Sequence, residues 1–301
     1  MISRFALLGA FLAWPAAFDQ TTRPSQARPD ALPAAIVTLV QGTVESRQPP
    51  ASALLLQRFD RIAAGTSVET AADASVILAF RSGARTRIDG GSHVRIETDG
   101  VTRLAGSVTP LARVPVVPLV AAVAGAGRVV AAVRVRADGI VVRTPDRGMT
   151  TTADATALVF EPVAANVYDV EIEDGAARIV WRKRVPASPA RVPAGVLEPG
   201  HAYRWQVRAQ TPAGFVLEGR GMFATLAAAE TQARQALHAA VVTDDPSWPG
   251  LLAEVDYSLG LWAEALDAFG VIRDDGAADA AILGRIAELE RRLAAPNRQE
   301  R

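Results

Sequence analysis

The spacing of apolar residues changes at about residue 226, and this change most constrains what the chain can fold into. Before that point, short stretches alternate apolar and polar side chains and are separated by turn-forming residues, which is typical of β-strands. After it, apolar residues recur at helical spacing, as on the buried face of an amphipathic helix. We therefore predict a mainly β protein with an α-helical C-terminal module.

The N-terminus has the pattern of a secretory signal peptide. Arg4 is followed by an uncharged apolar stretch, Phe5 to Phe18, which is too short to span a bilayer as a helix but has the length of a signal-peptide core. We expect cleavage after the small residues Ser25-Gln26-Ala27, so that residues 1–27 are removed; Pro15-Ala16-Ala17 is the weaker alternative. Export predicts a periplasmic or secreted protein, and the competing interpretations are an uncleaved anchor or a buried helix.

Residues 34–110 predict the first β domain. Strands are expected over Ala34–Val44, Val68–Thr70, Ser75–Phe80, Arg85–Asp89, Val94–Ile96 and Val101–Val108. Val76, Leu78 and Phe80 share one face of the strand at residues 75–80, which predicts that this strand is buried on one side only. Turns about every ten residues favour a sheet stack, a sandwich or a short solenoid.

This domain resembles a FecR-type domain, named for the periplasmic signal-relay protein of ferric citrate uptake. The matching residues are Gly42-Thr43-Val44, Gly65-Thr66-Ser67-Val68-Glu69-Thr70, Ser75-Val76-Ile77-Leu78-Ala79-Phe80, Arg81-Ser82-Gly83-Ala84 and Ser92-His93-Val94-Arg95-Ile96. Thr66 stands where the family usually has aspartate, and residues 81–84 replace its acidic turn. Gly65 and Gly83 are expected to adopt positive φ where the chain reverses.

Residues 111–135 are predicted to be a linker and the first strand of the next domain. The segment Val114 to Gly127 is apolar, but it contains Pro115 and Pro118, which do not suit a transmembrane helix. We expect an accessible linker that leads into a strand over residues 128–135. The mature chain then contains no stable membrane span.

Residues 136–225 resemble a fibronectin type III-like β-sandwich. The resemblance rests on Phe160-Glu161-Pro162, on Tyr168-Asp169-Val170-Glu171-Ile172 and on Leu197-Glu198-Pro199-Gly200-His201-Ala202-Tyr203-Arg204-Trp205-Gln206-Val207. Phe160 replaces the early core tryptophan of the family. Alternation predicts that Tyr203, Trp205 and Val207 face the core, and Asp174-Gly175 is typical of a hairpin turn.

Residues 226–295 predict a helical hairpin tail. Leu259-Gly260-Leu261-Trp262-Ala263-Glu264-Ala265-Leu266-Asp267-Ala268-Phe269 resembles a tetratricopeptide helix pair. A repeat array normally needs about three such units, so we expect a short cap that either binds a peptide or only packs. Trp262 is interpreted as a core residue. Ile282, Ile286 and Leu289 share a face of the last predicted helix.

Charge suggests what the tail contacts. Residues 28–221 hold 23 basic and 18 acidic residues, whereas residues 223–301 hold 7 basic and 13 acidic residues. An acidic tail favours a basic peptide or the basic β-surface of the chain itself. Glu254 and Asp267 are the predicted exposed residues for partner binding.

Few residues suit catalysis. The chain has no cysteine and three histidines, His93, His201 and His238, which are far apart in sequence. It has no nucleophile elbow, phosphate loop, zinc-binding histidine pair or EF-hand loop. The acidic residues at positions 169–174 are better explained as the solvated face of a strand than as the carboxylate pair of a glycosidase. We predict no catalytic residue, no cofactor and no metal.

These observations favour an exported bacterial cell-envelope binding or scaffold protein. Its expected partners are envelope proteins, or peptidoglycan or another glycan. Zero net charge argues against a nucleic-acid partner. The alternative is a transmembrane regulator of the FecR type that signals to a sigma factor, although only Met1 to Arg4 precede the apolar stretch. A carbohydrate-active enzyme is a distant alternative.

Overall fold

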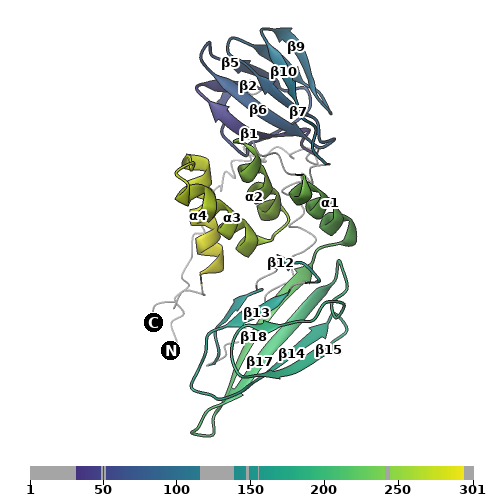
Figure 1. Cartoon of the computed structure of the whole chain (residues 1–301), viewed down its shortest axis with the longest axis vertical. Helices are drawn as coiled ribbons and strands as arrows, with labels where there is room; N and C mark the ends of the chain where they lie inside the picture. The colour runs from purple at the N-terminus through teal and green to yellow at the C-terminus, as the bar shows by residue number, and fades with distance from the viewer. Residues whose placement is uncertain are drawn as a thin grey trace, which may run out of the picture. The chain divides into compact units, whose positions relative to one another are not determined.

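The computed structural model describes residues 32–48, 50, 52–115, 139–146, 149–154, 156–240 and 245–294. The described strands, β1 to β18, all precede the helices α1 to α4 (Figure 1). The protein is thus mainly β with a helical C-terminal part, as the apolar spacing predicts. In the part of the chain that the structure describes, no helix is long and apolar enough to cross a membrane. The predicted signal peptide and the predicted strand at 128–135 lie outside the described residues.

The first β region consists of two five-stranded antiparallel sheets. We call the sheet with strand order β10-β7-β6-β1-β4 the covered sheet and the one with order β3-β2-β5-β8-β9 the open sheet. Apolar side chains of both sheets form one core. The strands are β1 (Ala35–Gln41), β2 (Val44–Arg47), β3 (Leu54–Leu55), β4 (Arg61–Ile62), β5 (Ser67–Thr70), β6 (Ser75–Phe80), β7 (Arg85–Ile88), β8 (His93–Ile96), β9 (Val101–Ala105) and β10 (Val108–Leu111).

The single strand predicted at residues 34–44 is two strands in different sheets. β1 pairs with β6 in the covered sheet, and β2 pairs with β5 in the open sheet. Gly42 lies between them at φ 70°, a conformation that glycine adopts without steric cost. The turn glycines Gly65 and Gly83 have φ 87° and 81°, which confirms the prediction of positive φ at both.

β6 differs from its prediction, because every residue of this strand is buried. Val76, Leu78 and Phe80 face the core between the two sheets, as alternation predicts. On the opposite face, Ala79 packs with Ile36 of β1 against apolar residues of the helical part. The prediction of a half-buried strand is therefore wrong, because the helices cover the outer face of this sheet.

The second β region has a three-stranded sheet, β11-β13-β16, and a five-stranded sheet, β12-β18-β17-β14-β15. Both sheets contribute to one apolar core, in which Tyr203, Trp205 and Val207 are buried as predicted. β12 pairs with β18 in parallel. The strands are β11 (Val142–Thr144), β12 (Met149–Thr151), β13 (Ala157–Phe160), β14 (Tyr168–Asp174), β15 (Ile179–Val185), β16 (Ala190–Arg191), β17 (Ala202–Gln210) and β18 (Val216–Thr225).

Four helices form the C-terminal part, which we call the helical module: α1 (Ala228–Ala239), α2 (Trp248–Ser258), α3 (Trp262–Asp274) and α4 (Ala280–Leu293). Pro249 lies in the first turn of α2, where the missing N–H has no intrahelical partner to lose. The predicted face of the last helix is confirmed, since Ile282, Ile286 and Leu289 are buried.

The start of the predicted linker is not accessible. Val114 is buried among the residues that join the covered sheet to the helices. Its N–H donates to the carbonyl of Gly83 at 2.9 Å. A Cβ on Gly83 would lie 2.0 Å from the Val114 carbonyl oxygen, so this turn has room only for glycine. Residues 116–127 of the predicted linker lie outside the described residues.

Candidate binding surfaces

One apolar contact of the helical module is with the turn that precedes β4. Phe59 of this turn is buried in the cluster formed by α2, α3 and α4. Its ring meets that of Phe269 edge to face, with centroids 5.6 Å apart. Phe59 adopts φ 73°, which is uncommon for a residue with a side chain and persists only where surrounding contacts hold it. The turn thus occupies the apolar space between the helices with a side chain of the chain itself.

Three arginines of the first β region bind the helical module beside this contact. Arg58 Nε donates to the Thr38 carbonyl at 2.7 Å, while its Nη1 lies 3.2 Å from Asp279 Oδ2 at the start of α4. Arg61 donates to the Ser258 hydroxyl at 2.8 Å. Burial lowers the pKa of Arg58, and the attraction of Asp279 opposes this effect.

Arg85 on β7 makes the third link. It is almost fully buried, pairs with Asp245 and donates to the Ser247 hydroxyl at 2.9 Å. Its guanidinium also lies over the Trp248 ring, 5.8 Å from the centroid. The basic β-surface and the acidic helical module therefore meet within this chain, which is one of the two alternatives that their opposite charges favour.

The sequence gives only a weak signal for this interface. Residues 56–60 show no apolar periodicity, although Phe59 is a large aromatic residue of a type that is often buried. Arg85 lies at the start of a predicted strand, and the sequence does not indicate which residues its side chain contacts. Which helix each side chain meets depends on residues about 160 to 220 positions away.

Glu254 is not an exposed residue, and its predicted exposure is wrong. It is fully buried on α2, where Arg285 of α4 donates to both carboxylate oxygens at 2.9 and 3.0 Å. Burial raises its pKa to about 7, against the opposing attraction of Arg285 and Arg61. Asp267 on α3 is exposed, as predicted. The two residues do not form one surface, so a partner could reach only Asp267.

Asp256, a second buried carboxylate on α2, has a lowered pKa, in contrast to Glu254. Burial raises the pKa of Asp256, but hydrogen bonds from His238 and Arg234 more than offset this and bring it below the ordinary value. Arg234 Nε and Nη2 donate to the two carboxylate oxygens at 2.6 and 2.9 Å. His238 Nε2 lies 3.4 Å from the same carboxylate. The arrangement joins α1 to α2.

Trp262 is half-buried at the start of α3 rather than a fully buried core residue. The guanidinium of Arg292 lies over the Trp262 ring, 4.8 Å from its centroid. Phe269, about two turns further along the same helix, is fully buried.

We expect Phe269→Ala to lower the free energy of unfolding by about 3–5 kcal/mol, as for other buried aromatics. Trp262→Ala should cost clearly less, because part of its ring stays in contact with water in the native state. Urea titrations of the two variants followed by circular dichroism compare them. Equal losses would mean that Trp262 is as important to the core as Phe269.

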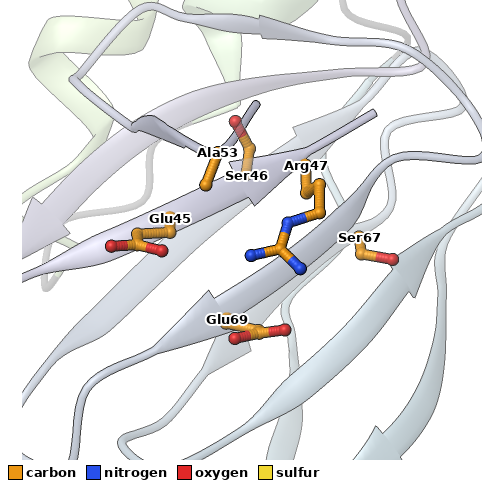
Figure 2. Close-up of a pocket in the computed structure, with 6 residues that line it drawn as sticks. All are labelled: Glu45, Ser46, Arg47, Ala53, Ser67 and Glu69. Atoms are coloured by element: carbon orange, nitrogen blue, oxygen red, sulfur yellow. The ribbon is translucent and has the colours of Figure 1, made fainter. Parts of the chain in front are cut away.

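The outer face of the open sheet carries a shallow polar depression, shown in Figure 2. Its lining residues come from β2, β5 and the loop before β3: Glu45, Ser46, Arg47, Ala53, Ser67 and Glu69. Glu45 and Glu69 lie directly opposite each other across the β2–β5 pair, and in Figure 2 the Arg47 guanidinium lies to the right of Glu45 and above Glu69. His93 Nε2 is 3.7 Å from Glu69 Oε1. These side chains are mostly exposed, so the depression offers polar contacts without an enclosed site.

Asp169 and Glu171 of β14 are held in ion pairs. Arg182 Nη2 lies 2.6 Å from Glu171 Oε1, and Arg184 Nε lies 2.9 Å from Asp169 Oδ1. Gln206 also donates to Glu171 at 2.9 Å. These cross-strand pairs account for Asp169 and Glu171 as a structural feature of the sheet.

The remaining histidine lies in a turn. His201 is exposed, with Nδ1 3.0 Å from the Pro199 carbonyl oxygen. Among the described residues, no group of three or more His, Asp or Glu side chains is placed to hold a metal ion. No protein-family model matches the chain, and no curated protein matches it.

Proposed function

We propose that the protein is an exported bacterial cell-envelope binding or scaffold protein that acts through contacts with envelope proteins or with a glycan such as peptidoglycan, and not through catalysis. Its first β region is a FecR-type domain, its second a fibronectin type III-like domain and its tail a tetratricopeptide-like helical module.

The contact between the helical module and the first β region carries this proposal. Phe59 fills the apolar space between α2, α3 and α4, and Arg58 and Arg85 hold the acidic ends of the helices. Because of these contacts, the helical module stabilises the first β region, which we call its brace role. The surfaces that remain for a partner are then the exposed faces and edges of the sheets.

Hydrogen bonding in the second β region supports its assignment to the fibronectin type. Tyr203 lies near the start of β17, and its hydroxyl accepts the backbone N–H of Glu198 at 2.8 Å. A tyrosine that bonds back to the chain a few residues upstream at this corner is a feature of immunoglobulin-like sandwiches. The pairing order β15-β14-β17-β18 in one sheet and β11-β13-β16 in the other suits the same architecture.

Export predicts a defined N-terminus. Protein recovered from the envelope fraction of a bacterial expression host should begin between Phe18 and Asp30, because signal peptidase cleaves after the apolar stretch. N-terminal sequencing measures this. A matched control with Leu7 and Leu8 changed to arginine should stay uncleaved in the cytoplasm. Recovery of intact Met1 from the cytoplasm of cells making the unchanged chain would contradict export and with it the scaffold role.

A further inference from the structure

β15 is the longest strand with one free edge among the described residues. Its seven residues pair with β14 on one side, from Tyr168 opposite Val185 to Glu173 opposite Ile179, and no described strand pairs with its other side. The other sheet edges in the described part are shorter than β15: β9 has five residues and β11 has three. β3, β4 and β16 have two residues each, β10 contains Pro110, and β12 is bonded to the helical module through the Thr150 N–H and the Gly260 carbonyl.

The side chains of β15 leave this edge open. Arg182 and Arg184 pair with Glu171 and Asp169 of β14, so their guanidiniums lie back over the neighbouring strand. The backbone groups on the outer side of β15 are therefore not covered by these long side chains. An extended segment could add to the sheet by main-chain hydrogen bonds, as in β-strand addition.

Charge decides what kind of segment fits. Arg182, Lys183 and Arg184 are consecutive and exposed, so the edge is basic on both faces of the sheet. Lys183 is the one lysine of the chain and lies opposite Val170, on the face that elsewhere contacts the core. A segment added to β15 would place its side chains next to these groups, whereas the carboxylates of β14 would be one strand further away.

Two other occupants are disfavoured by the same residues. In an antiparallel pair of two β15 strands centred on Lys183, Lys183 would face its own copy and Arg182 would face Arg184, which is destabilising. A fully apolar strand would leave Lys183 without a charged partner, and an inward-facing charge on an edge strand is a known means of preventing such pairing. Ile179 and Val180, which are 49 % and 37 % exposed, provide an apolar contact at the start of the strand.

We propose that the β15 edge, Ile179–Val185, is a binding site for an extended acidic segment of a partner protein, which adds as a further strand with its carboxylates on the face of the sheet that carries Lys183. The proposal rests on the proposed binding function and names the class of ligand and the surface that takes it.

The test uses the purified chain and three fluorescent octapeptides, in which valine alternates with glutamate, with lysine or with serine. Fluorescence anisotropy at low salt should show binding of the glutamate peptide, at least tenfold weaker binding of the lysine and serine peptides, and weaker binding as salt is raised. Two further glutamate peptides are methylated at alternate backbone nitrogens, one at the odd positions and one at the even positions. Only one of the two should lose binding, because only one set of amides faces β15.

Variants locate the site. Lys183→Glu removes a charge that has no ion-pair partner among the described residues, so the fold should be unaffected while affinity for the glutamate peptide falls about tenfold. Arg95→Glu makes the same charge change on the exposed face of the open sheet and should leave affinity unchanged. Equal loss in both variants, equal binding of the lysine peptide, or no binding of the glutamate peptide would overturn the proposal.

Two further outcomes separate the proposals. A concentration-dependent dimer of the chain alone that Lys183→Glu alters would assign the edge to a second copy and overturn the acidic-segment proposal. Peptide binding is measured on purified protein, so a failure of export would leave this result standing. Conversely, an exported protein that binds no acidic peptide would retain the envelope function and lose only this site.

Discussion

Phe59→Ala is expected to lower the free energy of unfolding by about 3–5 kcal/mol, the usual cost of removing a buried aromatic side chain. Phe59 lies in the apolar cluster of α2, α3 and α4, so its loss opens a cavity between the helical module and the first β region. Alanine has the same difficulty at φ 73° as phenylalanine, so the variant measures lost packing and not released backbone strain.

Denaturant titration followed by circular dichroism measures this effect. The matched control is Phe215→Ala in the β17–β18 turn, where the ring is 70 % exposed, and its stability should change by no more than about 0.5 kcal/mol. Similar small changes in both variants would show that the helical module does not depend on Phe59, and the brace role would lose its main support.

The second large effect is a pH dependence set by Glu254. Its pKa is raised from the ordinary value of 4.5 to about 7, first because burial penalises the charged form. Between these two values the native state keeps the proton that the unfolded state releases. The stability contributed by the group is therefore fully present below pH 4.5 and is lost as pH rises through about 7, by about 3 kcal/mol in total.

The variant Glu254→Gln cannot titrate, so it should lack this fall in stability. Denaturant titrations of both proteins at pH 5, 6, 7 and 8 give the difference, in which the contributions of Asp256 and other carboxyls cancel. Asp267→Asn, on the exposed side of α3, is the control and should run parallel to the unchanged protein. Parallel curves for Glu254→Gln and the unchanged protein would show that Glu254 stays ionised across this range.

The sequence predicted the features that depend on neighbours a few residues apart. Alternation identified the core face of β17 at Tyr203, Trp205 and Val207, and helical spacing identified the buried face of α4. Local patterns succeed here because a strand or a helix that buries one face must repeat its apolar residues at its own period.

The sequence did not predict where the chain covers itself. Alternation in β6 indicated one buried face, and the other is buried by apolar residues far along the chain, such as Leu237 of α1 and Leu251 of α2. Charge in the helical module suggested exposed carboxylates, yet Glu254 lies beneath Arg285. Residue type alone does not separate a solvated glutamate from a buried one, because the difference lies in a partner 31 residues away.

The candidate surfaces follow the same division. The basic run at residues 182–184 is visible in the sequence, but its position on an unpaired edge depends on the strand order of the whole sheet. Phe59 and Arg58 belong to a short turn without periodicity, so no local pattern marks them. Sequence alone therefore determined the periods, the turns and the buried faces of single elements. The tertiary structure decided which strands were buried on both faces and which long edge strand has no second partner among the described strands, because both depend on contacts between residues far apart in the chain.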